Sequence, residues 1–472
     1  MKHSPSPEFV AEALAHGLSE AEVARQWGRL QTDSEQTKPE SPCILGSGIR
    51  RLEAGELTEF SRKGQGLNPN RAVRFVPASG AASRMFEAVV GRDPSALEQL
   101  NLRWDLFPFR QAAEAAAPCE TEEQRWSAVV EVLDLPSLPK GALDFHVEDG
   151  GIRTAFDAQL IEWAQSLSQK GARIHFTLPV LGFEEHLQGI VKMAKSMGLV
   201  ADASVQNPST DTLAIGADHR PFLLENGAPL FRPGGHGSLI HNLSEIGKSS
   251  SRALVSIKNI DNVRPTSALG DVLPWRKALL GLADQLDHDR ILALNALEVG
   301  EVQLAMAWLK NGPLHPMDRP PSDPESLREA LDRPLLVAGM VRNEGEPGGG
   351  PFWVRDDQGK LRAQVVESAE MNMADPSTRD CVARATHFNP VDLVCAIHDA
   401  SGQPYHLPEF IDARRDFVVS KSHRGRPLRA LEHPGLWNGA MGRWNSVFVE
   451  VHSATFAPVK TVFDLLRPAH RS

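Results

Sequence analysis

Hydrophobic positions near the start of the chain follow a helical pattern. Between residues 7 and 31, apolar side chains recur every three or four positions, which is the spacing of one buried helix face. Residues 32–42 are polar and predict a linker. We therefore expect residues 1–70 to form a helical appendage with its linker, and the main domain to begin near Arg71.

From Arg71 onward, short apolar runs alternate with segments of helical period. Strands are predicted at residues 73–77, 173–178, 199–206 and 253–259, and helices from residue 83, across 94–134, near 152–169 and at 183–197. This alternation predicts an α/β domain with a mixed, mostly parallel sheet and helices on both faces. Ligands of such sheets bind beyond the carboxyl ends of the strands.

The alternation becomes looser after Asp261. Helices are predicted near residues 275–285 and 293–309, strands at 335–341, 364–367, 392–397 and 447–451, and a last helix after Thr461. A proline-rich break at 313–324 and a glycine-rich turn at 346–350 separate some of these segments. We expect the main domain to cover residues 71–400 and a smaller C-terminal part to cover 401–472.

Composition narrows the class of protein. Of 472 residues, 41% are hydrophobic and 23% are charged, which is typical of a globular protein. The 60 acidic residues outnumber the 50 lysines and arginines, which argues against nucleic acid as the main partner. The four cysteines are dispersed, and no apolar run is long enough to cross a membrane. We expect a soluble cytoplasmic protein without a membrane partner; the pattern predicts no oligomeric state.

The first predicted strand leads into a loop of small residues, Ala78-Ser-Gly-Ala-Ala-Ser83. Small side chains let a backbone approach an anion, and a helix opening near Ser83 would point its free N–H groups at the same place. The segment has the form of a phosphate-binding loop. The same arrangement also joins ordinary α/β units, so by itself it leaves both interpretations open.

Four other segments carry candidate chemistry, and each has a plain structural alternative. Lys140 and Lys460 lie on proline-fixed turns, where a lysine pairs with phosphate or is simply solvated. His236 lies among three glycines, in a ligand loop or an ordinary turn. Asp261 follows an apolar strand, where a carboxylate binds Mg²⁺ or forms an Asp-Asn turn with Asn262.

The order of these segments resembles the UDP-sugar pyrophosphorylases, the uridylyltransferases that join UTP to a sugar 1-phosphate. The resemblance rests on Ala78-Ser-Gly-Ala-Ala-Ser-Arg84, Pro139-Lys-Gly141, Gln206, Pro233-Gly-Gly-His-Gly237 and Asn259-Ile-Asp-Asn262. It continues in Gln364-Val-Val-Glu367, Phe388-Asn389, Phe456-Ala-Pro-Val-Lys-Thr461 and Asp464-Leu-Leu466. These spaced motifs extend over residues 71–466. The whole chain, including Gly435-Leu-Trp-Asn-Gly-Ala-Met441, more closely resembles a bacterial family, the domain of unknown function 4301 family.

The resemblance implies a Rossmann-like nucleotidyltransferase fold of the GT-A type and release of pyrophosphate from a nucleoside triphosphate, with UTP the expected nucleotide. It implies catalytic roles for Arg84, Lys140 and Lys460, and a Mg²⁺ ligand in Asp261. It implies nucleotide contacts from Ala78, Ser79, Gly80, Ala81, Ala82, Ser83, Gln206, Gly234, Gly235 and His236. It implies sugar contacts from Asn262, Gly349, Glu367 and Asn389.

The loop departs from the pattern of the UDP-sugar pyrophosphorylases at two positions. Those enzymes have glycines where this chain has Ser79 and Ala82, so each Cβ atom is expected to take up room beside the nucleotide. An alternative function is therefore a weakly active or inactive sensor that binds sugar nucleotides with the same fold. An NAD-dependent dehydrogenase is disfavoured, because the loop lacks the spacing of the dinucleotide-binding glycines.

Overall fold

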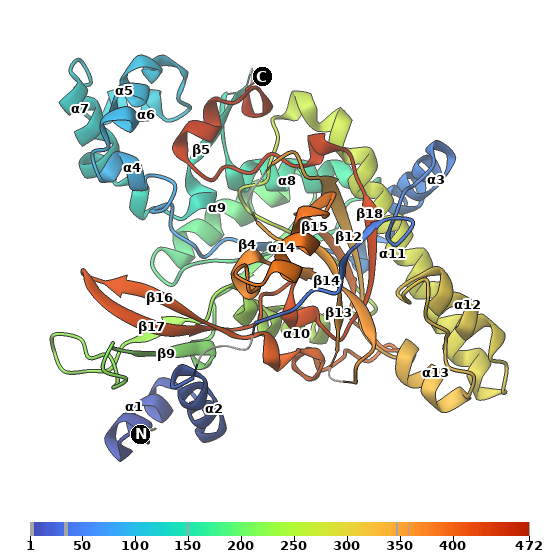
Figure 1. Ribbon diagram of the computed structural model, residues 1–472. Coiled ribbons are helices and arrows are strands. Elements are labelled where there is room, and N and C mark those ends of the chain that lie inside the picture. The colour runs from blue at the N-terminus through green and yellow to red at the C-terminus, as the bar shows by residue number, and fades with distance from the viewer. Residues whose placement is uncertain (1–3, 33–35, 149–150, 346–347, 357, 472) are drawn as a thin grey trace.

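A nine-stranded sheet forms the centre of the molecule (Figure 1). The structure, a computed structural model, describes residues 4–32, 36–148, 151–345, 348–356 and 358–471. The strand order is β2 (Ile44–Leu45), β3 (Gly48–Arg50), β18 (Asn445–Glu450), β12 (Leu335–Arg342), β15 (His387–Ala396), β11 (Leu254–Lys258), β4 (Ala72–Pro77), β7 (Arg173–Thr177) and β8 (Val200–Ser204). Residues 346 and 347 of the expected glycine-rich turn, and 33–35 of the expected linker, lie outside the described residues.

The sheet is mixed and mostly parallel, as predicted. Strands β11, β4, β7 and β8 are parallel to one another, and so are β12, β18 and β3. Only β15 runs antiparallel to both of its neighbours, β11 and β12. The central strands are buried on both faces, which explains why their sequences are nearly continuous apolar runs.

Helices cover both faces of the sheet. The longer ones are α8 (Ala155–Ser166), α9 (Phe183–Ser196), α10 (Leu239–Lys248) and α11 (Leu269–Glu298). Two helices cover the segments predicted near 275–285 and 293–309, but the predicted break between them is misplaced: α11 continues through the polar stretch at 286–290, and α12 (Gln303–Asn311) follows it. Arg290 and Asp287 pair there at 2.7 Å inside the protein, so polar residues that suggested a break are instead buried and neutralised.

The N-terminal residues form two helices where one periodic segment was expected, α1 (Pro7–His16) and α2 (Glu20–Leu30). Gly17, with φ of 114°, ends the first helix. Both helices pack on a smaller sheet of β10 (Phe231–Pro233), β9 (Asp211–Ile215), β17 (Arg426–Glu432) and β16 (Phe417–His423). This sheet was not predicted.

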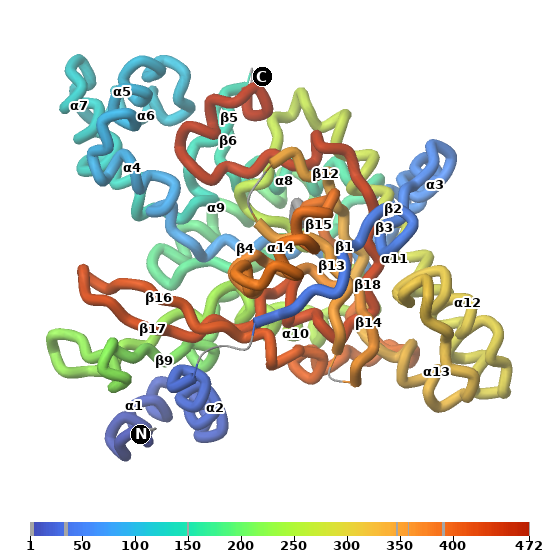
Figure 2. Tube along the Cα trace, in the orientation of Figure 1, coloured from blue at the N-terminus to red at the C-terminus, as the bar shows by residue number. Residues whose placement is uncertain are grey.

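The expected boundary near Arg71 does not divide the structure. Strand β3 pairs with β18 inside the central sheet, and Figure 2 shows the segment of β1–β3 running beside β13, β14 and β18. Helix α3 (Ala54–Gln65) packs along α11. Residues 41–66 therefore belong to the central body, because their pairing partners lie near the other end of the chain.

Shorter elements surround this body. The expected helical stretch 94–134 forms a lobe of short helices, α5 (Pro94–Leu102), α6 (Arg110–Ala116) and α7 (Glu122–Ser127), next to α4 (Glu87–Val90). The others are α12 (Gln303–Asn311), α13 (Pro324–Leu331), α14 (Pro376–Ala383), β1 (Ser41–Pro42), β5 (Asp144–Glu148), β6 (Gly151–Thr154), β13 (Gly350–Arg355) and β14 (Leu361–Val366). The expected last helix is a 3₁₀ turn at Val462–Leu466. In the described part of the chain, no helix is long and apolar enough to span a membrane.

The contact between α3 and α11 predicts a stability effect. A Cβ atom at Gly281 would collide with the Phe60 carbonyl of α3, whereas one at Gly270, on the same helix, would meet nothing within 4 Å. Gly281→Ala should lower the free energy of unfolding by about 1–3 kcal/mol or more through overpacking. Gly270→Ala should leave it unchanged or raise it by up to about 1 kcal/mol. Urea unfolding measures both; equal effects would contradict this packing.

Candidate nucleotide and sugar site

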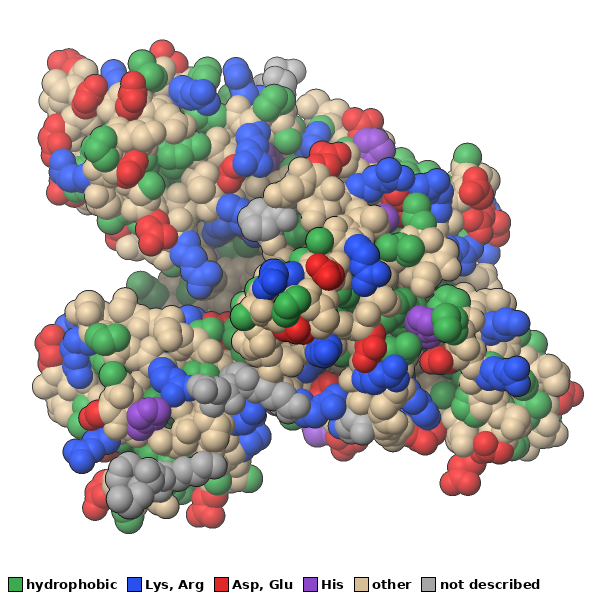
Figure 3. Space-filling view, viewed as in Figure 1, with side chains coloured by type: hydrophobic (Ala, Val, Ile, Leu, Met, Phe, Trp, Pro, Cys, Tyr) green, Lys and Arg blue, Asp and Glu red, His purple; other side chains and the backbone are tan. Residues whose placement is uncertain are grey.

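The loop after β4 is joined to the end of β7 and to the turn that carries Lys140. The N–H of Ala78 donates to Thr177 at the end of β7, and the Lys140 N–H donates to the carbonyl of Gly80 at 3.1 Å. Ala81 forms an isolated β-bridge with Pro139. Figure 3 shows a hollow between the lobe of α4–α7 and the arm of β9, β16 and β17, with lysine and arginine side chains on its wall.

The loop after β4 offers unpaired donors. Within the described residues, the N–H groups of Ser79, Gly80, Ala81, Ser83 and Arg84 donate no hydrogen bond in the protein. Arg84 is exposed, and no described group pairs with its guanidinium. The expected helix at Ser83 is wrong, because residues 83–86 form a turn and α4 begins only at Glu87. An anion at this loop would therefore be bound by a turn of free N–H groups and not by the end of a long helix.

The two departures from the family's loop have different surroundings. Ala82 is fully buried in the main hydrophobic core, so its Cβ atom points away from the open side of the loop. The expectation that this methyl group takes room beside the nucleotide is wrong. Ser79 is partly exposed, so a ligand at the loop could contact its side chain. A Cβ atom at Gly80 would meet nothing within 4 Å, so this glycine leaves open space.

Asp261 brings two lysines from distant segments together. Its Oδ2 atom lies 3.0 Å from the Nζ atom of Lys140 and 3.5 Å from that of Lys460. Lys140 also donates to the carbonyl of Val459 at 2.9 Å. The Lys460 side chain is 64% exposed, whereas Asp261 is buried. The predicted metal residue and both predicted catalytic lysines therefore form one cluster.

Asn262 connects this cluster to the C-terminal segment. Its Nδ2 atom donates to the carbonyl of Thr455 at 3.1 Å, and its Oδ1 atom accepts the N–H of Ala457 at 2.8 Å. The N–H of Val459 donates to the carbonyl of Asp261. Asn262 is nearly inaccessible, so its amide positions the loop that carries Lys460.

The donor set around Asp261 fits Mg²⁺ as a single protein ligand. Its Oδ1 atom is buried and has no hydrogen-bond partner. Among the described residues, no group of three or more His, Cys, Asp or Glu side chains could hold a metal ion. Mg²⁺ commonly takes one or two carboxylates and completes its shell with water and substrate phosphates, which agrees with one free carboxylate oxygen.

The predicted base-binding residues lie beyond β8 and ahead of α10. The Nε2 atom of Gln206 is buried without a hydrogen-bond partner. Gly235 has φ of 78°, and a Cβ atom at Gly234 would collide with His433. The protein's own packing therefore already requires these glycines, whatever the ligand.

His236 connects the predicted base residues to the predicted sugar residues. Its Nδ1 atom accepts the N–H of Leu436 at 3.0 Å, so the ring proton is on Nε2, which faces Glu367 at 3.5 Å. The ring stacks on Trp437 with a centroid distance of 4.2 Å. Burial raises the pKa of Glu367, but hydrogen bonds from His236 and Asn438 outweigh it and lower that pKa below its usual value.

A cavity of 360 Å³ is lined by most of the predicted sugar-binding residues. Gly349 and Glu367 line it together with Asn262 and Lys460. Aromatic side chains of Phe388, Trp437 and Phe456 also face it, and sequence reasoning assigned them no role. Asn389 lies on β15, but its side chain is outside the described residues. The cavity thus offers a carboxylate, a lysine and flat apolar surfaces.

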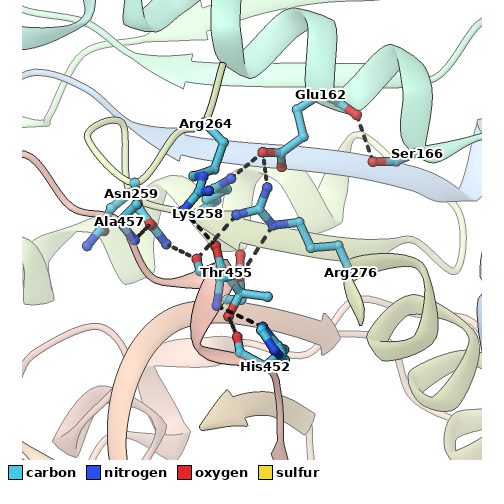
Figure 4. A network of polar contacts seen from close by, with 12 residues as sticks. Glu162, Ser166, Lys258, Asn259, Arg264, Arg276, His452, Thr455 and Ala457 are labelled. Carbon is cyan, nitrogen blue, oxygen red and sulfur yellow. Dashed lines mark hydrogen bonds and ion pairs between the residues drawn. The ribbon is translucent and has the colours of Figure 1, made fainter. Parts of the chain in front are cut away.

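Behind the site, one buried carboxylate contacts three buried cations, two of which, Lys258 and Arg276, are labelled in Figure 4. Glu162 of α8 pairs with Arg74 of β4 at 3.0 Å, with Lys258 of β11 at 2.5 Å and with Arg276 of α11. Burial opposes ionisation of Glu162, but the positive charges of Arg276, Lys258 and Arg74 lower its pKa to about 2. Burial lowers the pKa of Lys258 to about 7, with the charge of Arg276 acting in the same direction.

This network supports the segment of the predicted metal residue Asp261 and the loop that carries Lys460. Lys258 immediately precedes Asn259, whose carbonyl accepts a 2.8 Å hydrogen bond from Gln159. Arg276 reaches the carbonyl of Thr455 at 3.4 Å. Sequence reasoning missed the network. The available signal was a single charge inside otherwise apolar segments, such as Arg74 in β4 and Lys258 in β11.

The fold is of the nucleotidyltransferase type. The structure resembles the uridine diphosphate N-acetylglucosamine pyrophosphorylase from Trypanosoma brucei in complex with inhibitor, with a TM-score of 0.51, 12% identity, and coverage of 98% of this chain and 81% of that one. It also resembles a mutant of the UDP-glucose pyrophosphorylase from Leishmania major in complex with UDP-glucose, with a TM-score of 0.48, 13% identity, and coverage of 99% and 80%. At such identities the likeness shows the fold alone.

The chain belongs to the family described as Domain of unknown function (DUF4301), whose model matches residues 8–101 and 127–471. This membership and the fold confirm the resemblances drawn from the motifs. A search of curated proteins finds no match.

Removing the central carboxylate should destabilise the protein strongly. Glu162→Gln would leave three buried cations with insufficient negative charge, and the free energy of unfolding should fall by about 3–5 kcal/mol. Glu123→Gln, which breaks an exposed pair with Arg92, is the matched control and should change stability little. Denaturant unfolding compares them. Equal stability of the two variants would show that the buried network does not hold the fold.

Placing the glycine of the UDP-sugar pyrophosphorylases at position 82 should not improve nucleotide binding. Ala82→Gly removes a core methyl group and adds freedom to the unfolded chain, so unfolding should become easier by about 1–2 kcal/mol. Nucleotide affinity, measured by calorimetry at a temperature where both proteins are folded, should stay within about twofold. A tenfold gain in affinity would mean that the methyl group does face the nucleotide.

Proposed function

We propose that this protein is a nucleotidyltransferase that joins a nucleoside triphosphate, with UTP the expected nucleotide, to a sugar 1-phosphate and releases pyrophosphate. The observation that carries the proposal is the cluster of Asp261, Lys140 and Lys460 beside a loop with free N–H groups. Three segments far apart in sequence bring positive charge and donors to one place, as a reaction between two phosphorylated substrates requires.

In this proposal, a phosphate oxygen of the sugar 1-phosphate attacks the α-phosphorus of the nucleotide. The bond from that phosphorus to the bridging oxygen of the β-phosphate breaks, and pyrophosphate leaves with the bonding electrons. The free N–H groups of the loop at residues 79–84 hold the triphosphate, and the exposed Arg84 faces the departing pyrophosphate. Positioning and charge neutralisation supply the catalysis, so no protein nucleophile is needed.

The remaining residues have separate roles. Lys140 and Lys460, both held at Asp261, turn toward phosphate oxygens of the two substrates. Mg²⁺ bound at Asp261 would neutralise phosphate charge when present. The unpaired Nε2 atom of Gln206 donates to the base, and His236 and Glu367 border the base and the sugar hydroxyls respectively.

Turnover tests this proposal directly. The purified protein is incubated with Mg²⁺, each nucleoside triphosphate and a panel of sugar 1-phosphates, and released pyrophosphate is assayed. Lys460→Gln should lower kcat by about 100-fold or more, because it removes a charge that acts on the transition state. Lys192→Gln, at an exposed lysine of α9, should have no effect.

The two variants also separate the enzyme from a sensor. Nucleotide binding without turnover across the whole panel, with only a modest loss of affinity in Lys460→Gln, would identify a sugar-nucleotide sensor instead. If the protein neither binds a nucleotide nor turns over any substrate of the panel, both the enzyme and the sensor are ruled out.

A further inference from the structure

A second cavity, of 320 Å³, lies between α12, α13 and the turn of the β13–β14 hairpin. Figure 1 shows α12 and α13 on the opposite side of the sheet from the lobe of α4–α7. None of its lining residues lines the sugar cavity described above. Its volume is at the lower end of small-molecule sites, which span about 300–1,000 Å³. It can therefore be considered as a site of its own.

The lining of this cavity has an excess of positive charge. Two carboxylates, of Asp318 and Glu329, line the cavity together with five cationic side chains. The cationic side chains are those of Arg319, Arg333, Arg355, Lys360 and Arg362. In the part of the chain that the structure describes, the side chains of Arg319 and Lys360 have no ion-pair partner. A bound anion would supply the missing negative charge.

Two of the arginines are held close together at the cavity wall. Arg362 pairs with Asp356 at 2.6 Å, and Arg333 is within 3.3 Å of Glu329, whose side chain is 62% exposed. Burial lowers the pKa of Arg333 to about 10, and the positive charge of Arg362 acts in the same direction. Each of these two guanidinium groups has one carboxylate partner, as Arg355 has in Glu40 at 3.0 Å. Planar guanidinium groups held side by side match phosphate oxygens in pairs.

The rest of the lining is apolar. Leu309, Leu314 and Leu361 contribute to it, with the ring of Pro313. A small inorganic anion would leave this surface uncovered, whereas a phosphate ester with a compact apolar part would cover both surfaces. We propose that this cavity is a second binding site, for a phosphorylated small molecule, and that its occupancy changes ligand affinity at the nucleotide and sugar site.

The β13–β14 hairpin connects the two sites. Leu361 and Arg362, at the start of β14, line the second cavity, whereas Val365, near its end, and Glu367, just after it, line the sugar cavity. The paired strand β13 begins next to Gly349 at the sugar cavity and ends at Arg355 in the second one. From Arg362 to Glu367 the strand spans about 17 Å. A ligand that fixes the hairpin turn would therefore act on Glu367 through a continuous strand.

Calorimetric titration of the 472-residue chain with phenyl phosphate tests the binding site. Arg319→Gln/Lys360→Gln should weaken binding at least tenfold without lowering Tm, because both side chains are exposed and unpaired. Lys310→Gln, an exposed lysine of α12 outside the lining, and Arg84→Gln, at the nucleotide loop, should bind as the parent protein does. The site is refuted if the parent protein does not bind, or if Arg84→Gln loses affinity and the double variant keeps it.

The coupling is tested by titrating UTP with and without saturating phenyl phosphate. The affinity for UTP should change at least fivefold, and the double variant should show no change. Unchanged UTP affinity in the parent protein would overturn the coupling. The coupling rests on the proposed function. If the proposed function fails, UTP does not bind even without phenyl phosphate; if only the coupling fails, UTP binds with the same affinity in both titrations.

Discussion

The ion pairs that Glu162 forms with Arg74, Lys258 and Arg276 are the interaction on which the rest of the structure depends. The four side chains come from two strands and two helices, so the network fixes how α8 and α11 sit against the centre of the sheet. A buried ion cluster adds little net stability over apolar packing, but an incomplete one is very costly. We therefore expect the pairing to act mainly by excluding other arrangements of these elements.

The same network explains why the site assembles from distant segments. Asn259 follows Lys258 directly, and Arg276 reaches the carbonyl of Thr455, to which the amide of Asn262 also donates. The carboxyl end of β11 and the loop before Lys460 are thus held by one set of contacts (Figure 4). Asp261 and the two lysines meet because the chain around them is fixed, and the exposed Lys460 keeps its freedom to move toward a ligand.

Much of the fold could be predicted from the sequence, because strands buried on both faces are largely apolar, as in β11 and β12. The predictions that failed concern segments whose structure depends on contacts with residues far away in the sequence. Gly48–Arg50 join the central sheet by pairing with β18, and the polar stretch in α11 is buried in the helix with Arg290 and Asp287 paired to each other. The motif order brought Asp261, Lys140 and Lys460 into consideration together, but the aromatic side chains of the sugar cavity and the network around Glu162 needed the three-dimensional structure. The placement of Ala82 in the core likewise follows from packing that no local pattern reveals.

A crystal structure of the protein with UTP and Mg²⁺ would test the central claim most directly. The account predicts the triphosphate on the N–H groups of residues 79–84, the uracil within hydrogen-bond distance of the Nε2 atom of Gln206, and Lys140 turned from Asp261 toward phosphate. A nucleotide bound elsewhere, or a triphosphate that leaves those N–H groups unpaired, would contradict it.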